Sequence, residues 1–186
     1  MVKRFSPPTI INDRGETLYM VKTYHMRRSD KEIKDKKKLV KILKETNFVT
    51  LALAKDNEPY VVSLSHSYDE EAGCLYVHCA TEGKKLDFMH DNPIVSGQAL
   101  IDHGYHAGEC SHLYVSAVFK GKVEFIEDLD IKKKALEHMI LHQEKNPKSL
   151  LTRLKAFQAG SLLDKTIVAK IIIDELTGKK SAEVEF

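Results

Sequence analysis

The sequence predicts a mainly β fold, a mostly antiparallel barrel with a few helices packed against its outside. Segments rich in β-branched and aromatic residues follow one another, and turn-forming residues separate them. Helical spacing of apolar residues occurs only in short stretches between these segments. The chain has no internal repeat and no low-complexity tract, and the order of its segments disfavours a parallel nucleotide-binding sheet.

The strand segments favour a barrel of six strands. Turns are expected at residues 55–58 and 69–73, and a loop rich in glycine, histidine and cysteine is expected at residues 103–112. Seven segments have strand character, one more than the six strands expected, and they are 48–54, 59–68, 75–79, 94–101, 113–120, 122–126 and 167–173.

Four helices are expected around this sheet. The first follows Asp35, a suitable N-cap, and the second spans residues 81–90 and ends before Asn92-Pro93. Two more lie between the strand that ends near Ile126 and the last strand. Their apolar stripes are Ile131, Ala135, Leu136, Met139 and Ile140, and then Leu150, Leu151, Leu154 and Phe157.

Length and composition indicate one domain of ordinary size. The 186 residues divide into an N-terminal arm at 1–25, which we expect to wrap a partner subunit, and a domain at 26–186. A hydrophobic fraction of 42% and a net charge of +2 exclude the signature of disorder and give no nucleic-acid footprint. The lysine-rich run at 31–41 is interrupted by acidic residues, which is typical of a solvated helix face.

The location expected from the sequence is the cytoplasm. The longest apolar stretch, Ile167–Ile173, is interrupted by Lys170, so we expect no membrane association. The three cysteines are an odd number without a secretion signal, which predicts free thiols in a reducing compartment.

The start of the second expected helix is the most informative segment. Gly83, Lys84 and Lys85 fall in its first turn, where a lysine costs about 0.3–1 kcal/mol unless an anion compensates. Free backbone N–H groups, the Thr81 hydroxyl and two ammonium groups together suit a phosphate dianion. The alternative is that Thr81 caps the helix, Glu82 offsets its dipole, and both lysines are solvated.

The strand before it has a polar face. Tyr60, Val62, Leu64 and Tyr68 alternate with Val61, Ser63, Ser65 and Ser67, so the two sets face opposite sides. A flat face of small side chains lets a planar heteroaromatic ring approach the backbone. The alternative is an ordinary solvent-facing side of an antiparallel sheet.

Several sequence blocks carry a family resemblance. They are MRRSDKEI at 26–33, PYVVSLSHSY at 59–68, HCATEGKKLD at 78–87 with Asn92-Pro93 after it, YVSAVFKG at 114–121 and IDELTG at 173–178. Together they resemble the pyridoxamine phosphate oxidase-related flavoproteins, most closely the nitroimidazole-resistance branch. The resemblance runs from about Met26 to Gly178.

This resemblance implies a six-stranded FMN-binding split barrel that forms a homodimer, with two FMN molecules at the interface and both subunits touching each flavin. FAD is an alternative cofactor. Serines on the flavin-facing strand and the lack of tryptophan depart from the vitamin B6 oxidases, so oxidation of vitamin B6 is not expected. The cofactor-binding residues that the resemblance and the phosphate argument predict are Val61, Val62, Ser63, Leu64, Ser65, His78, Cys79, Thr81, Gly83, Lys84, Lys85 and Ser116.

Histidines supply two further hypotheses. His66 is a candidate proton donor to a substrate stacked on the flavin, although alternation also fits a buried structural histidine. The 103–112 loop holds three histidines, a glutamate and Cys110, but their spacing matches no standard metal site, so no metal is predicted.

The expected function is an FMN-dependent oxidoreductase that takes a hydride from NAD(P)H and reduces a small molecule, with nitroaromatics as candidates. A non-catalytic flavin- or haem-binding protein is the first alternative. A metal-binding or purely interacting protein that uses the 103–112 loop is the second.

Overall fold

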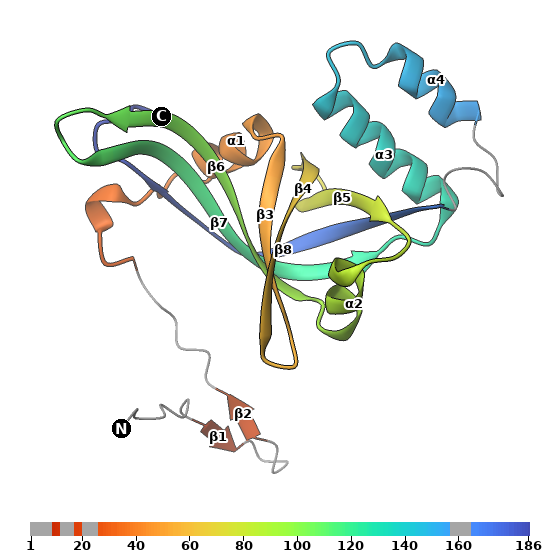
Figure 1. Cartoon of the computed structure of the whole chain (residues 1–186), viewed down its shortest axis with the longest axis horizontal. Helices are drawn as coiled ribbons and strands as arrows, with labels where there is room; N and C mark the ends of the chain where they lie inside the picture. The colour runs from red at the N-terminus through yellow and green to blue at the C-terminus, as the bar shows by residue number, and fades with distance from the viewer. Residues whose placement is uncertain (1–8, 12–16, 20–25, 157–164) are drawn as a thin grey trace.

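Six strands close into one antiparallel barrel in the computed structural model, which describes residues 9–11, 17–19, 26–156 and 165–186 (Figure 1). Their order around the barrel is β3-β4-β5-β8-β7-β6, and β3 pairs with β6 to complete the circle. The predicted six-stranded antiparallel barrel is therefore confirmed. The strands are β3 Phe48–Lys55, β4 Glu58–Asp69, β5 Cys74–Ala80, β6 Ile94–His106, β7 Ser111–Phe125 and β8 Thr166–Lys180.

The core lies inside the barrel because alternate residues of each strand point inward. On β3, for example, Val49, Leu51 and Leu53 are at most 3% exposed. Phe119 of β7 is one of the largest fully buried side chains. Burial of each such side chain stabilises the fold by roughly 1.5–3 kcal/mol.

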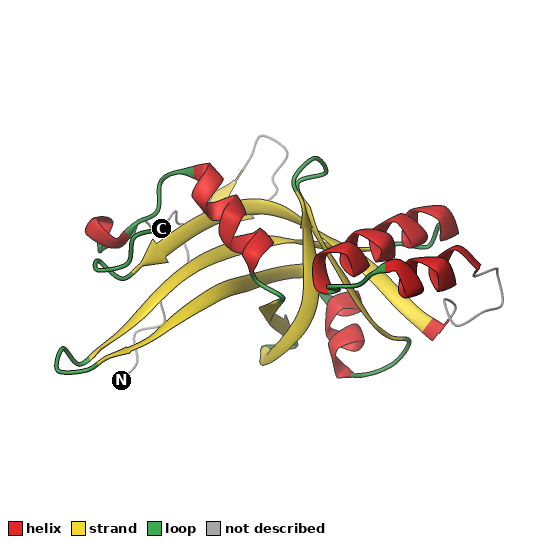
Figure 2. Ribbon diagram, turned by 90° about the horizontal axis from the view of Figure 1, so that it is seen from above, coloured by secondary structure: helices red, strands yellow, loops and turns green. Residues whose placement is uncertain are grey.

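Helices cover the barrel from outside. Helix α1, Lys36–Glu45, begins after Asp35, whose carboxylate accepts from the Lys37 N–H at 2.9 Å as an N-cap. Its buried face packs on the core. Helices α3, Leu129–Gln143, and α4, Lys148–Ala156, lie side by side at one end of the sheet (Figure 2). The short helix α2, Lys84–Asp91, follows β5. All four predicted helices are present, but α2 begins at Lys84 rather than at residue 81, so Gly83 is its N-cap and not part of its first turn. Only Phe157 of the predicted apolar stripes falls outside the described residues.

The N-terminal region contributes two described strands. β1 Thr9–Ile11 and β2 Thr17–Tyr19 pair antiparallel in a sheet separate from the barrel. A 3-10 turn, η1 Ser29–Lys31, precedes α1. Most of the predicted arm at 1–25 lies outside the described residues.

Two details of the strands also differ from the prediction. The segments 113–120 and 122–126 form one strand, β7, with a register shift between Lys120 and Gly121. The predicted loop at 103–112 is mostly strand, because β6 continues to His106 and β7 already begins at Ser111. Backbone pairing extends here beyond the apolar pattern, so polar residues form a two-stranded ribbon that leaves only residues 107–110 as the turn.

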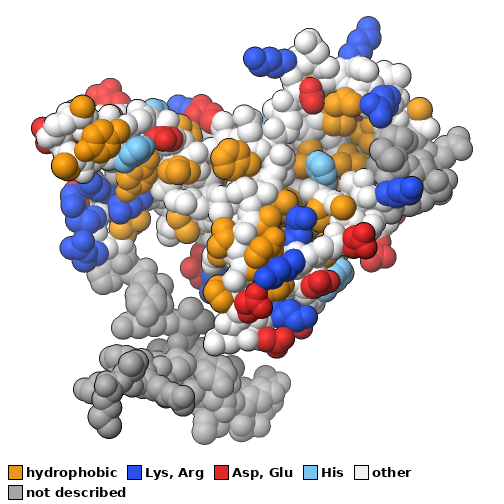
Figure 3. Space-filling model, viewed as in Figure 1, with side chains coloured by type: hydrophobic (Ala, Val, Ile, Leu, Met, Phe, Trp, Pro, Cys, Tyr) orange, Lys and Arg blue, Asp and Glu red, His pale blue; other side chains and the backbone are white. Residues whose placement is uncertain are grey.

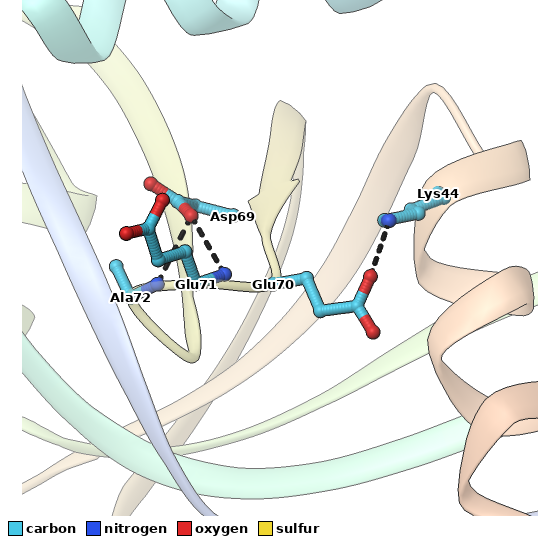
Figure 4. Close-up of polar contacts among 5 residues, drawn as sticks. All are labelled: Lys44, Asp69, Glu70, Glu71 and Ala72. Carbon is cyan, nitrogen blue, oxygen red and sulfur yellow. Dashed lines mark hydrogen bonds and ion pairs between the residues drawn. The ribbon is translucent and has the colours of Figure 1, made fainter.

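The turn between β4 and β5 is held by side chains. The carboxylate of Asp69 accepts from the backbone N–H groups of Glu71 and Ala72, each at 3.0 Å (Figure 4). The neighbouring Glu70 forms an ion pair with Lys44 of α1 at 2.5 Å. These contacts fix the hairpin and tie it to the helix.

Among the described residues, no helix is long and apolar enough to cross a membrane. The three cysteines are free thiols, as predicted.

Candidate functional site

The candidate site lies where β4 and β5 separate. They pair only from His66↔Val77 to Asp69↔Cys74. Beyond that point β4 pairs with β3 alone and β5 with β8 alone among the described strands. A cavity of about 660 Å³ opens in this split.

The cavity contains half of the predicted cofactor residues. Val62, Ser63 and Leu64 line it from β4, and His78 and Cys79 line it from β5. Lys85 of α2 completes this predicted set. The remaining lining residues are Ala80, Lys165 and Thr166.

At the cavity, one edge of β4 is not paired with any described strand. In an antiparallel strand, successive residues direct their backbone N–H and C=O groups to alternate sides. Since β3 occupies one side of residues 62–65 and no described strand occupies the other, backbone groups here can hydrogen-bond a ligand.

Sequence reasoning missed Lys165 and Thr166. Thr166 pairs with Ala80 at the start of β8, which places Lys165 beside the end of β5 and close to α2. The two lysines of the cavity are 80 residues apart in the chain, so no local motif joins them. The only available signal was a lysine directly before the last predicted strand.

The start of α2 has the geometry expected of an anion-binding end. Its N-cap is Gly83, with φ of 130° and no side-chain cap, so the alternative in which Thr81 caps the helix is wrong. Thr81 and Gly83 are exposed in the loop that leads from the cavity to the helix. The uncapped N–H groups of the first turn remain open to a ligand.

Lys84 points to a different partner. Its Nζ lies 2.6 Å from a carboxylate oxygen of Glu58 and stands over the rings of Tyr60 and Phe88 at 5.1 and 5.3 Å. It therefore ties α2 to the β3–β4 hairpin and does not line the cavity. In this chain the cavity ammonium groups are those of Lys85 and Lys165.

The predicted strand face is present in part. Val61 is 62% exposed, and Ser63 and Ser65 are also exposed on the outer face of β4. The Ser63 hydroxyl lies 3.1 Å from that of Thr50 on β3. Ser67 is instead buried, because α3 covers it and His138 lies 2.9 Å from its hydroxyl.

Burial at the cavity shifts the pKa values of both β5 residues, His78 and Cys79. Desolvation lowers the pKa of His78, which favours a neutral imidazole. Burial raises the pKa of the Cys79 thiol, and Lys85 offsets part of that effect. Cys79 is therefore a neutral thiol near neutral pH, so a nucleophilic thiolate is not expected.

His66 is not at the cavity. It is 0% exposed, and its Nε2 lies 2.9 Å from the carbonyl oxygen of Leu43 in α1. Burial lowers the pKa of its imidazole to about 4. Strand alternation turns the side chain into the core, so the structure supports the structural alternative rather than direct proton donation.

Ser116 lies at another place on the same subunit. It is 3% exposed, and its hydroxyl donates to the carbonyl oxygen of Lys179 at 3.3 Å. It lines a second cavity between β6, β7 and β8. Within one chain it does not join the residues of β4 and β5.

The histidine-rich segment forms no metal cluster among the described residues. Instead, His112 Nε2 pairs with an Asp102 carboxylate oxygen at 3.1 Å. Cys110 is exposed in the hairpin turn.

Solved structures resemble this fold. A protein from Bacteroides thetaiotaomicron, described as a 5-nitroimidazole antibiotic resistance protein, is 28% identical with a TM-score of 0.66 over 80% of this chain and 85% of its own. A FAD-binding protein from Mesorhizobium loti is 26% identical, with a TM-score of 0.56 over 79% of this chain and 95% of its own. The FAD and heme binding protein of Mycobacterium smegmatis shares the fold at 19% identity and a TM-score of 0.63, over 81% and 73% of the two chains.

No curated protein matches this chain. The family model described as pyridoxamine 5'-phosphate oxidase matches residues 35–180, which include all six barrel strands, α2 and both cavities apart from Met26. The chain belongs to the pyridoxamine 5'-phosphate oxidase family.

Proposed function

We propose that this protein is a flavin-dependent oxidoreductase that binds FMN at a homodimer interface and reduces a small molecule, with nitroaromatic compounds as the candidate substrates. NAD(P)H is the proposed hydride donor. The observation that carries the proposal is the cavity in the β4–β5 split, which combines an open strand edge with Lys85 and Lys165.

The cavity residues fit a flavin mononucleotide. A phosphate suits the two ammonium groups and the free N–H groups at the start of α2. The backbone of β4 offers donors and acceptors to the polar edge of a planar ring, and Ser63 is small enough to let the ring approach. A volume of about 660 Å³ falls within the usual range of cofactor pockets.

The bound flavin would supply the hydride chemistry, and the protein would supply position and charge. Lys85 and Lys165 would neutralise the phosphate, while the open edge of β4 would orient the ring. The similar structures described as FAD-binding and as a nitroimidazole resistance protein support both the cofactor class and the substrate class.

The proposed dimer interface is the outer face of the barrel. A row of uncharged side chains crosses five adjacent strands through successive residue pairs. Phe48, Val61 and Leu100 flank it and are 57%, 62% and 47% exposed. Figure 3 shows hydrophobic side chains over the β6–β7 arm and the middle of the molecule. The uncharged row is Ser63, Thr50, Gln98, Val118 and Thr177.

This row links the two cavities. Ser63 at one end lines the β4–β5 cavity, while Gln98, Val118 and Thr177 at the other end line the β6–β8 cavity. A two-fold axis that crosses the row near its middle places opposite ends of two subunits together. Each flavin site would then receive residues from both subunits, which accounts for Ser116 as a cofactor-site residue contributed by the partner.

The proposal is tested by the absorbance spectrum of the purified protein. We expect the two visible bands of an oxidised flavin, bleaching by NADH or NADPH, and reoxidation by a nitroaromatic compound. Cofactor released by heat and separated by chromatography distinguishes FMN from FAD. A purified protein that neither carries nor takes up flavin would contradict the proposal.

A haem- or flavin-binding protein without turnover is the second candidate. It is favoured by His78, whose lowered pKa leaves a neutral imidazole at the cavity that can ligate iron. An intense Soret band that His78→Ala abolishes would favour haem. Flavin bands without turnover of any acceptor would favour a flavin carrier.

A further inference from the structure

Helix α3 packs across β4, β5 and β8. Its His138 Nδ1 lies 2.9 Å from the Ser67 hydroxyl on β4. The Gln143 amide donates to the carbonyl oxygen of His66, also on β4, at 2.8 Å. The His138 ring lies edge-on to Tyr76 of β5, with 5.6 Å between the ring centroids. These contacts place the helix against the paired ends of β4 and β5, where the split begins.

The first turns of α3 reach the start of β8 (Figure 1). The ammonium group of Lys132 donates to the carbonyl oxygen of Thr166 at 3.2 Å, in a partly buried contact, and Thr166 lines the β4–β5 cavity. An apolar cluster of Ile126, Ala135 and Val168 also joins α3 to β8. Lys132 therefore connects the helix directly to the wall of the cavity.

Lys132 stands on a part of α3 whose position is fixed. The carboxylate of Asp128 caps the helix and accepts from two backbone N–H groups of the first turn, at 3.0 and 2.9 Å. Two residues before the cap, the Ile126 N–H donates to the carbonyl oxygen of Val168 at 2.9 Å. Because the cap and this backbone bond hold the start of the helix against β8, Lys132 is kept within reach of Thr166.

The residue directly before Thr166 is the cavity lysine Lys165. Its side chain is exposed and forms no ion pair with any described residue, so its position depends on the adjoining backbone. Thr166 pairs with Ala80 of β5 on one side, while β7 pairs with β8 only as far as Ala169. At this end of β8, α3 therefore takes the place of β7 as a neighbour, and Lys132 makes the contact.

We propose that Lys132 is a positioning residue of the flavin site. By donating to the Thr166 carbonyl oxygen, it holds Lys165 where the ammonium group of that lysine meets the flavin phosphate. The inference rests on the proposed function and gives α3 a part in it. A binding group must be held within about 0.5 Å of its productive position, and supporting contacts outside the site provide this precision. The helix would thereby set the preference of the site for FMN over riboflavin, which has the same ring and ribityl chain but no phosphate.

The test compares the affinities of the apo-protein for FMN and for riboflavin, both measured by quenching of flavin fluorescence. We expect Lys132→Met to lower the FMN affinity about three- to tenfold, as the loss of one hydrogen bond would give, and to leave the riboflavin affinity unchanged. Lys134→Met is the matched control. Lys134 is exposed on the opposite side of α3 and does not line the cavity, so this variant should behave like the wild type.

A double-mutant cycle shows whether Lys132 acts through Lys165. In a protein that already carries Lys165→Met, adding Lys132→Met should lower the FMN affinity no further, because the group that Lys132 positions is absent. Additive losses would overturn the inference, since Lys132 would then act on the phosphate by itself. An equal loss of FMN and riboflavin affinity in Lys132→Met would also overturn it, because α3 would then support the fold in general.

The wild type separates this inference from the proposed function. If the wild type binds FMN and Lys132→Met binds it equally well, the inference is wrong and the proposed function stands. A wild-type protein that binds no FMN would contradict both.

Discussion

Two consecutive lysines at the start of α2 have different surroundings, so substitution of each one should separate the proposed cofactor binding from stability. Lys85 lines the β4–β5 cavity, while Lys84 pairs with Glu58. We predict that Lys85→Ala weakens flavin binding about tenfold or more, because a charge-assisted contact contributes roughly 1.5–3 kcal/mol. Titration of the apo-protein with FMN, followed by fluorescence quenching, measures the change.

Lys84→Ala is the matched variant. The exposed ion pair and the cation–π contacts together contribute about 1 kcal/mol, so urea unfolding should show a loss of that size. Flavin affinity should stay near that of wild type. The reverse result, in which Lys84→Ala loses flavin and Lys85→Ala does not, would contradict the assignment of the cavity.

His66 should make the fold sensitive to acid. Its pKa is about 4 in the folded protein, below the ordinary value of 6.5, because the core desolvates the charged imidazole. Between these two values the unfolded chain binds a proton that the folded protein does not, so stability falls as the pH drops through this window. The full loss below pH 4 would be up to about 3 kcal/mol, at 1.36 kcal/mol per pKa unit.

Urea unfolding at pH 7 and pH 5 tests this. The wild type should lose stability between these two values, and His66→Gln should lose clearly less, although its stability at pH 7 is lower because the core is altered. His103→Gln, at an exposed position, should behave like the wild type. An identical pH dependence in His66→Gln would show that another group causes the loss.

At the scale of elements, the connection from β5 to α2 depends on one backbone conformation. Gly83 has φ of 130° and ψ of 160°, a region that is essentially restricted to glycine. An added Cβ would meet no atom within 4 Å, so backbone strain alone would act. We predict that Gly83→Ala destabilises the protein by about 1–3 kcal/mol and weakens flavin binding, because the first turn of α2 must shift.

Thermal unfolding and FMN titration of the same sample measure both effects. Glu82→Ala provides the control, since it changes an exposed neighbour in the same loop without the special conformation. A fully stable Gly83→Ala protein with normal flavin affinity would mean that the loop can adopt another backbone conformation without loss.

The sequence predicted those features of the elements that depend on neighbouring residues. Alternation placed Val62 and Leu64 on the opposite face from Ser63, and the cap at Asp35 located α1. These features are local. The cavity lysine Lys165 and the covering of Ser67 by α3 depend on which distant segments meet, and no single window of the sequence contains that information. The ribbon at 103–112 was predicted as a loop because backbone pairing needs no apolar pattern.

At the scale of the whole molecule, one barrel carries two separate cavities on its outer face. The β4–β5 cavity and the β6–β8 cavity share no lining residue, and the row from Ser63 to Thr177 runs between them. A single subunit cannot bring the two cavities together, because the closed barrel fixes their separation. Symmetric pairing of two barrels can, so flavin binding and dimer formation should be coupled.

A charge on the outer face tests this coupling. Phe48 is 57% exposed beside the uncharged row. We predict that Phe48→Glu converts the proposed dimer to monomer, because an unpaired carboxylate buried in the interface costs several kcal/mol. Leu141→Glu is the control, since Leu141 is 56% exposed on α3 and away from the row. Sedimentation velocity gives the oligomeric state, and visible absorbance gives the flavin content. If each flavin site needs two subunits, as proposed, monomeric Phe48→Glu should lose its flavin, and a monomer that retains flavin would place the whole site within one chain.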